Sequence, residues 1–376
     1  MISWNLKTRT YQPIGLDIGY HSIKMIQLAI EKDRVCVIAA DKVHIDPEII
    51  DDDKEREKFT VTAIEQMLQR NSFQGSDIVF ALPNDKLKIT SIRVARANSE
   101  DIEQVMKKEA SKRFGLNSDD DVINYMFAGN VQNSGELKGE WILLAVDGET
   151  VRNYIGMLER LQLKPVAIDA IPCALFRSFK KLHKQQQDQE RTELLVDVGS
   201  RSTTIVFGRG GSIGFIKQIP IGGRKFNQEV AQKLGIDVKK AEALRATLRN
   251  EKLSKVEQQL PAPRPNARVK SSIDASTRQI MVDAISSVAE QLAKEISMCL
   301  KYYTVTFRGK RMEQLVLSGG EAYENILANI FKRQLTMDIE LAQPLKSCDM
   351  TNTNLDNENS ESLSEWALAV GLSLKD

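Results

Sequence analysis

Two aspartates have the surroundings that phosphate and metal chemistry requires, because each ends an apolar run and precedes a glycine and a hydroxyl. Their motifs are Asp17-Ile18-Gly19 and Asp197-Val198-Gly199. Backbone N–H groups and hydroxyls in such a tight turn can face an anion. A carboxylate at the end of the strand suits a hydrated Mg²⁺, which binds few protein ligands and keeps most of its waters. Taken singly, either stretch could equally be an ordinary hairpin in which Asp and Ser form the turn.

The repetition of this layout is the stronger observation. Ser22 and Ser202 each stand three residues after their glycine, and each turn is followed by runs that predict a further hairpin. The runs are residues 25–30 and 35–40 in the first copy, and 205–207 and 213–219 in the second. One chain with two copies of strand, turn and hairpin predicts a duplicated fold with a cleft between its halves. Two facing turns can hold a polyphosphate and its metal from both sides.

The residues between the two copies are expected to form a helix, a buried strand and a small inserted unit. An amphipathic helix ends at Arg70, and residues 77–82 form a strand that opens at the cleft. From residue 88 to residue 169 the order strand, helix, strand, strand, helix, strand predicts an α+β insertion of ferredoxin-like type. Residues 180–191 are polar and are expected to link the insertion to the second half.

The second half continues with helices and a third glycine turn. Helices are expected after Gly223, from Asp237, and over residues 275–303, with a proline-rich loop at 261–265. Residues 314–318 form a strand that ends in two glycines, which lets backbone approach a flat or anionic ligand closely. Residues 347–361 are polar and predict a flexible excursion, and Trp366 begins a closing helix.

The composition argues against several classes of partner and site. Over 376 residues, 52 Lys and Arg stand against 51 Asp and Glu, so no global attraction to nucleic acid or anionic lipid is expected. Four cysteines without a CxxC pair and three unclustered histidines predict free thiols and no Cys or His metal site. No apolar run approaches the roughly 20 residues that span a bilayer, so no direct membrane insertion is expected.

In combination, these motifs resemble those of a known superfamily. Asp17-x-Gly19, Asp197-x-Gly199 and Ser318-Gly319-Gly320 resemble, in that order, the phosphate-1, phosphate-2 and adenosine motifs of actin, heat-shock chaperones and sugar kinases. The position of the insertion resembles the 1C domain of FtsA and its pilus relatives. Residues 164–172, 219–223 and 235–242 are similar to the type IV pilus assembly proteins of the PilM family. The resemblance implies an α/β, actin-like duplicated ribonuclease-H-like fold with two lobes and an inserted α+β 1C-type subdomain.

The same resemblance implies ATP and Mg²⁺ as ligands. Asp17 and Asp197 would organise the metal and its waters, whereas Gly319 and Gly320 would flank the adenosine. Carried over in the same way, the residues that meet the phosphates are Gly19, Ser22 and Lys24 on one side and Gly199, Ser202 and Thr203 on the other. Lys240, Glu242 and Arg245 would line the adenine and ribose. Glu321 departs from the family pattern, which commonly has a small residue there, and would crowd or reshape the adenosine pocket.

The subdomains implied by the resemblance divide the chain into four parts. Subdomain 1A is predicted at residues 1–87, completed by about 166–190 and 364–376, and the inserted subdomain 1C at residues 88–165. Subdomain 2A is predicted at residues 191–226, completed by about 304–363, and the helical subdomain 2B at residues 227–303.

The function implied is that of a cytoplasmic scaffold for assembly of a type IV pilus or a related type II secretion system. Its partner would be the cytoplasmic N-terminal tail of an inner-membrane PilN-like protein, held in a groove between the first subdomain and the insertion. Other pilus assembly proteins are further partners, and self-association is left open. The chain would be peripheral at the inner membrane through its partner. The nucleotide would set the angle between the lobes, with hydrolysis slow at most, because no catalytic base is evident.

Two alternatives are weighed against this function. A cell-division protein of FtsA type needs a C-terminal amphipathic membrane helix, whereas residues 371–376 directly follow the expected closing helix. A small-molecule kinase of the same superfamily needs a base in the first half, for which Asp85 is the only candidate. Asp85 lies near a proline and is interpreted as a turn former.

Overall fold

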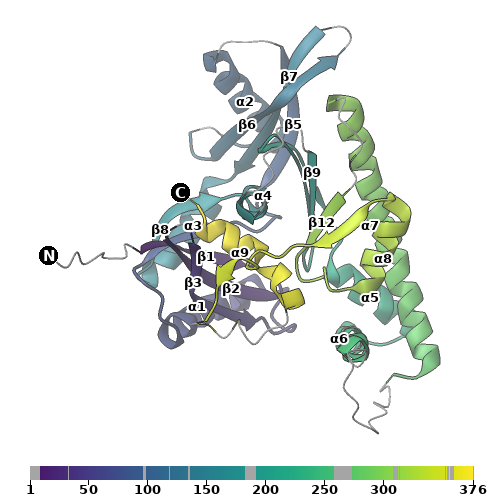
Figure 1. The fold of residues 1–376 in the computed structure, drawn as a ribbon. Coiled ribbons are helices and arrows are strands. Elements are labelled where there is room, and N and C mark those ends of the chain that lie inside the picture. Colours follow the sequence, from purple (N-terminus) through teal and green to yellow (C-terminus); the bar gives the residue numbers. More distant parts are fainter. Residues whose placement is uncertain are drawn as a thin grey trace, which may run out of the picture.

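The computed structural model describes residues 9–32, 34–95, 99–117, 119–133, 136–182, 192–257, 273–307, 312, 314–351, 353, 355 and 360–375. Within this part of the chain the strands form sheets of six, five and three strands. The six-stranded and five-stranded sheets belong to two lobes, and the three-stranded sheet belongs to the insertion (Figure 1).

The first lobe is built on the six-stranded sheet, with strand order β14-β3-β2-β1-β4-β8. Its strands are β1 (Thr10–Ile18), β2 (Ser22–Glu31), β3 (Arg34–His44), β4 (Asp77–Ala81), β8 (Lys164–Asp169) and β14 (Cys348–Asp349). Helices α1 (Asp53–Arg70) and α3 (Gly148–Arg160) cover one face, and α4 (Ile171–Leu182) and α9 (Ala367–Ser373) cover the other. Strand alternation explains this division, because Ile78 and Phe80 face one layer while Val79 and Ala81 face the other.

The second lobe repeats the first around a five-stranded sheet of order β11-β10-β9-β12-β13. Its strands are β9 (Thr192–Val198), β10 (Thr203–Arg209), β11 (Ser212–Ile219), β12 (Gln314–Ser318) and β13 (Asp338–Leu341). As in β3-β2-β1-β4-β8, three antiparallel strands are followed by two parallel ones. The predicted duplication is therefore confirmed. Helices α5 (Gly223–Leu234), α7 (Ala275–Phe307) and α8 (Asn325–Leu335) share the larger core of this lobe, and α6 (Val238–Glu257) packs on α5.

The insertion has strands in the order β5-β7-β6 and one helix of its own. These elements are β5 (Lys88–Ala95), α2 (Ser99–Phe114), β6 (Val122–Asn133) and β7 (Glu136–Val146). The ferredoxin-like order predicted over residues 88–169 does not describe the insertion by itself, because α3 packs into the core of the first lobe and β8 pairs with β4. Hydrogen bonds also join the insertion to α7 around the buried Glu140, which accepts from Tyr302 over 3.0 Å and from Arg93 over 2.8 Å.

The C-terminal segment corrects a second prediction. Residues 347–361 were expected to be a flexible excursion, but Cys348 and Asp349 pair in parallel with β3. Leu355 is buried in the same cluster as Leu345, with Cys348 and Met350 packed against it, so apolar contacts fix these described residues to the first lobe. The chain then enters the 3₁₀ helix η2 (Ser360–Trp366), which leads into the predicted closing helix α9. The linker predicted at 180–191 begins within α4, which extends to Leu182, and its residues 183–191 lie outside the described residues, as does the proline-rich loop at 261–265.

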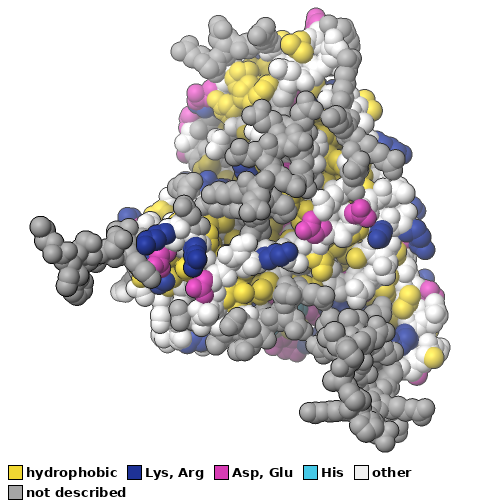
Figure 2. Space-filling model, viewed as in Figure 1, with side chains coloured by type: hydrophobic (Ala, Val, Ile, Leu, Met, Phe, Trp, Pro, Cys, Tyr) yellow, Lys and Arg dark blue, Asp and Glu magenta, His cyan; other side chains and the backbone are white. Residues whose placement is uncertain are grey.

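The exposed apolar side chains are concentrated on few elements. Figure 2 shows hydrophobic side chains gathered on the upper part of one face, over the insertion. Val122, Phe127 and Leu137 of the insertion are each about half exposed. None of the helices in the described ranges combines the length and the apolar character that crossing a membrane demands.

Candidate functional site

The two predicted turns have the same backbone geometry and face one cleft. The Gly19 N–H donates to the Ser22 carbonyl over 3.1 Å, and the Gly199 N–H donates to the Ser202 carbonyl over 3.0 Å. In both cases an aspartate two residues before the glycine is the last but one residue of an inner strand of the sheet. The duplication therefore extends from the sheets to the individual hydrogen bonds of the turns.

A cavity of about 140 Å³ lies between these turns, and we call it the phosphate cavity. It is lined by both lobes, by the third glycine turn after β12 and by η2 and α9. Nine of the thirteen predicted ligand-binding residues line it: Asp17, Gly19, Ser22, Lys24, Asp197, Gly199, Ser202, Gly319 and Gly320. The structure thus brings together three turns that are up to 300 residues apart in the sequence.

Buried charge is concentrated at the floor of the phosphate cavity. The Lys24 ammonium is 3.4 Å from an Asp17 carboxylate oxygen and 3.6 Å from Glu365, and its side chain is only 9 % exposed. Burial disfavours the charged lysine, but Asp17 and Glu365 outweigh it and raise the Lys24 pKa. Burial likewise raises the pKa of Asp17, which Lys24 only partly offsets.

Asp197 is the second carboxylate of the floor. Its Oδ1 accepts a hydrogen bond of 2.7 Å from the Ser318 hydroxyl at the end of β12. Burial raises the pKa of Asp197 to about 6, and the Ser318 hydrogen bond opposes this shift without cancelling it. A pair of buried carboxylates with raised pKa values is a site that gains from a bound cation.

Four predicted residues do not line the phosphate cavity. Thr203 is fully buried and donates to the Ile221 carbonyl, so its hydroxyl serves the fold. Lys240 is exposed beside Asp237, and Glu242 lies 3.4 Å from the His21 ring nitrogen Nδ1. Arg245 is fully buried in an ion pair that is described next.

Arg245 pairs with the glutamate that departs from the family pattern. Its Nη2 lies 2.6 Å from Glu321 and 3.5 Å from Glu324, and its Nη1 donates to Asn227 over 2.6 Å. Burial opposes ionisation of Glu321, but the Arg245 guanidinium outweighs it, so the Glu321 pKa is lowered. The side chain of Glu321 lies against Gly223, where an added Cβ would overlap its carboxylate. Glu321 therefore binds α6 to the third turn and does not project into the phosphate cavity.

Sequence reasoning missed two charged residues of the cavity. Glu365 comes from η2 and holds both Lys24 and Lys42, but nothing in its polar sequence context distinguishes it. Arg201 lies in the second turn, and its neighbours Gly199 and Ser202 were the signal that could have drawn attention to it.

Polar contacts close the lobes over the phosphate cavity. Asn84 of the first lobe donates to the hydroxyls of Ser202 and Thr204. Asp51, in the loop before α1, accepts hydrogen bonds from Arg201 and from Arg224 of the second lobe. Sites for organic ligands usually measure about 300–1,000 Å³. The phosphate cavity, at about 140 Å³, is smaller than this, so the space between the turns matches a phosphate group and an ion.

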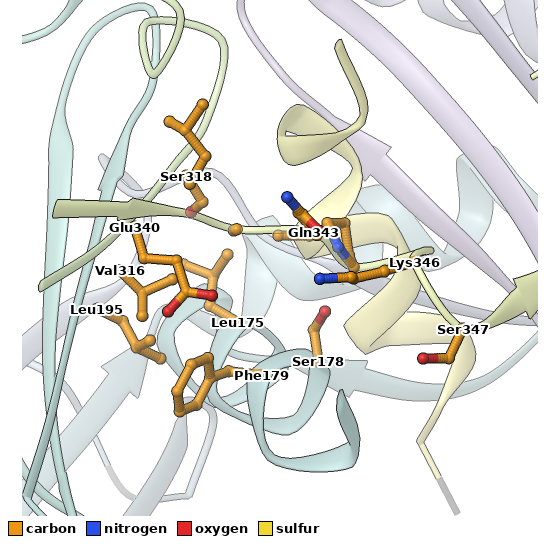
Figure 3. A pocket seen from close by; sticks show the side chains of 14 residues that line it. Leu175, Ser178, Phe179, Leu195, Val316, Ser318, Glu340, Gln343, Lys346 and Ser347 are labelled. Atoms are coloured by element: carbon orange, nitrogen blue, oxygen red, sulfur yellow. The ribbon is translucent and has the colours of Figure 1, made fainter. Parts of the chain in front are cut away.

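A larger cavity, of about 260 Å³, lies between α4 and the second sheet. Figure 3 shows Leu175 and Phe179 close to Leu195 and Val316, with Glu340 and Lys346 nearby. This cavity lacks the glycine turns and the paired carboxylates, and its lining mixes apolar side chains with polar ones such as Ser178 and Gln343. It is therefore not the candidate site for an anionic ligand, although Ser318 lines both cavities.

The residues of the phosphate cavity fit a phosphate chain with a divalent metal. The carboxylates of Asp17 and Asp197 are ligands that Mg²⁺ prefers. The Arg201 Nε is buried and has no hydrogen-bond partner, so a donor is available for an anion. A Cβ added at Gly320 would meet no atom within 4 Å, so there is free space beside the third turn. Among the described residues no group of three or more His, Cys, Asp or Glu could hold a metal, so an ion here would keep most of its water ligands.

Comparison with protein families decides the classification. A family model described as type IV pilus assembly protein PilM matches residues 15–261, which is more than half of the chain. The chain belongs to the PilM family. The model of cell division protein FtsA also matches, over residues 194–372, which is less than half of the chain and includes most of the second lobe.

Solved structures support the same fold. The PilM–PilN type IV pilus biogenesis complex contains a chain with a TM-score of 0.75 and 18 % identity, which covers 96 % of this chain and 98 % of that one. The ethanolamine utilization protein EutJ from Carboxydothermus hydrogenoformans has a TM-score of 0.53 and 13 % identity, over 97 % of this chain and 89 % of that one. The PilM-family chain thus has the actin-like fold with two lobes and an inserted α+β subdomain.

Proposed function

We propose that this PilM-family chain is an ATP-binding scaffold of type IV pilus assembly, or of a related type II secretion system. In this proposal the nucleotide sets the geometry between the lobes, and hydrolysis is slow at most. The observation that carries the proposal is the pair of equivalent turns, Asp17-x-Gly19 and Asp197-x-Gly199, that face each other across one cavity.

The nucleotide would be held by the residues of the phosphate cavity. Asp17 and Asp197 would hold Mg²⁺ through its waters, and Ser22 and Ser202 would donate to phosphate oxygens. Bound Mg²⁺ supplies positive charge that neutralises the phosphate chain. Lys24 stays charged because Asp17 and Glu365 raise its pKa, so it keeps its positive charge beside the phosphates. Gly319 and Gly320 would leave room for the adenosine. Lys240, Glu242 and Arg245 would act indirectly, by fixing α6 beside that space.

Slow hydrolysis follows from the loop beside the cavity. Hydrolysis requires a group that orients the attacking water. Asp85 accepts a hydrogen bond of 2.7 Å from the Tyr20 hydroxyl, and the Asn84 amide is bound to Ser202 and Thr204. Both side chains of this loop are therefore engaged in contacts of the protein itself.

The partner would be the cytoplasmic N-terminal tail of an inner-membrane PilN-like protein. A cavity of about 270 Å³, which we call the α1–α3 pocket, lies in the first lobe near the start of the insertion. It is lined by Ile18, Asp53, Arg56, Glu57, Thr60, Lys86, Thr150, Asn153, Tyr154 and Met157. The Arg56 side chain is 10 % exposed, and its Nη1 is buried without a hydrogen-bond partner, so it could donate to a peptide carbonyl. Through this partner the chain would be peripheral at the inner membrane.

The nucleotide part is tested by calorimetric titration of Mg·ATP into the purified protein and into an Asp197→Ala variant. We expect binding by the intact protein and loss of Mg²⁺-dependent binding in the variant. If the intact protein did not bind Mg·ATP, the proposal that it binds a nucleotide would be refuted. The proposed scaffold role would then depend only on binding of the PilN-like peptide.

The partner part is tested with a fluorescent synthetic peptide of the PilN-like N-terminal tail, followed by anisotropy. Asn153→Ala and Arg56→Met should weaken binding at least about fivefold, because each removes a polar group of the α1–α3 pocket. Lys346→Met, at the other cavity, is the matched control and should bind as the unaltered protein does. Equal effects of all three variants would contradict the proposed location of the peptide.

A further inference from the structure

Arg201 occupies an unusual position in the second turn. Its side chain crosses from the second lobe to the first, where its Nη2 donates to the Ile50 carbonyl over 3.1 Å and to Asp51 over 2.6 Å. The guanidinium also lies over the Tyr20 ring, 3.7 Å from the ring centroid. Arg201 therefore makes all of these contacts with the opposite lobe while its own turn lines the phosphate cavity.

One donor of Arg201 is left without a partner. Its Nε is buried and makes no hydrogen bond, although the residue lines the phosphate cavity beside Gly199 and Ser202. A buried N–H without an acceptor is costly, and a bound ligand is one way in which a native site satisfies it. A guanidinium suits the phosphate group because its N–H donors match two oxygens at once.

The other nitrogen-bearing side chains with a partner in the cavity are Lys24 and His21. Lys24 lies between Asp17 and Glu365, and His21 lies beside Glu242. Arg201 can turn toward a ligand at low cost, because Asp51 also accepts two hydrogen bonds from Arg224, of 2.5 and 2.8 Å. Asp51 thus keeps a cationic partner when Arg201 leaves it.

We propose that the Arg201 side chain binds the terminal phosphate of the nucleotide, so that the cleft discriminates a nucleoside triphosphate from a diphosphate. The inference rests on the proposed function, since it requires a nucleotide in the phosphate cavity. An adenosine beside Gly319 and Gly320 directs its phosphates to the two facing turns, and the end of the chain then reaches the side of the cavity that Arg201 occupies. Because Arg201 also contacts Asp51 and Tyr20, the lobe contact changes only when the third phosphate is present.

The experiment compares Mg·ATP and Mg·ADP by calorimetry in the intact protein and in Arg201→Met, Arg201→Lys and Arg224→Met. We expect the intact protein to prefer ATP about tenfold or more. Arg201→Met should weaken ATP binding about tenfold to a hundredfold and ADP binding less than about threefold. Arg201→Lys should recover part of the ATP affinity, because the ammonium restores charge without the planar pair of donors.

Arg224→Met is the matched control, because Arg224 binds the same Asp51 carboxylate but does not line the phosphate cavity. Both affinities should change less than about threefold in this variant. Equal loss of ATP and ADP affinity in Arg201→Met, or the same loss in Arg224→Met, would overturn the role of Arg201 and leave nucleotide binding intact. Failure of the intact protein to bind either nucleotide would overturn the proposed nucleotide function as well. Circular dichroism and thermal melting identify a variant that fails to fold. If Arg201→Met fails to fold, the ratio of ATP to ADP affinity in Arg201→Lys tests the role of Arg201.

Discussion

Replacement of Arg245 by methionine should destabilise the second lobe strongly. The arginine is 1 % exposed and neutralises Glu321 and Glu324, whose side chains are 12 % and 3 % exposed. Removing one member of a buried ion pair leaves uncompensated charge and costs about 3–5 kcal/mol. Arg249, 3.8 Å from Glu321, compensates only in part. We therefore expect Arg245→Met to lower the free energy of unfolding, measured by urea denaturation at pH 7, by an amount within or slightly below that range.

The pH dependence of the loss tests its cause. Arg245 lowers the pKa of Glu321, so the pair stabilises the fold above the ordinary carboxyl pKa of 4.5, and this contribution disappears as pH falls through the lowered pKa. The difference between Arg245→Met and the intact protein should accordingly shrink in acid. The double variant Arg245→Met, Glu321→Gln should regain at least about 1 kcal/mol at pH 7, because one buried charge is gone. A loss below about 1 kcal/mol for Arg245→Met, or one matched by the exposed Lys240→Met, would refute the reasoning.

Three further predictions concern the metal, the charge of the cavity and the helix contacts. Because the Asp197 pKa is about 6, only about a tenth of this carboxyl group is ionised at pH 5. Calorimetry should therefore show that Mg·ATP binds roughly tenfold more weakly at pH 5 than at pH 7.5. Asp197→Asn should remove this pH dependence. In the protein without ligand, the raised Asp197 pKa means that ionisation of Asp197 destabilises the fold as pH rises through 6. Asp197→Asn should therefore raise the melting temperature at pH 7. An unchanged or lower melting temperature would argue against this cost of burying the carboxylate. Gly371→Ala should lower the free energy of unfolding in urea by at least about 2 kcal/mol, because the added Cβ overlaps the Ala174 carbonyl. Gly156→Ala should instead stabilise α3 by about 0.5–1 kcal/mol, because its added Cβ meets no atom within 4 Å.

The sequence was sufficient for the features that local chemistry determines. Each phosphate turn combines an apolar strand, an aspartate and a glycine within a few residues, and its repetition at Asp17 and Asp197 indicated the duplicated sheets. Helix ends were also predictable, since Gly235 ends α5 in the left-handed conformation that glycine adopts most easily. The subdomain boundaries stay a prediction. Helix α3 packs into the core of the first lobe, and periodicity within residues 88–165 cannot indicate that contact.

The residues that were not predictable are those whose partners lie far away in the chain. Glu365 reaches Lys24 only because η2 packs against the first sheet, and sequence periodicity contains no information on that contact. The same applies to Arg245 and Glu321, which are 76 residues apart.

The departure of Glu321 from the family pattern was visible in the sequence, but its consequence depended on which cation lay opposite. A carboxylate without a partner would have crowded the adenosine space. Paired with Arg245, it instead draws α6 onto the third turn and leaves Gly320 exposed. Substituting Glu321 by the small residue common in the family would therefore not simply enlarge the pocket, because it would leave the Arg245 charge buried with Glu324 as its remaining close carboxylate. The two positions have to change together, so the chemistry of this corner of the cleft belongs to the pair and not to either residue alone.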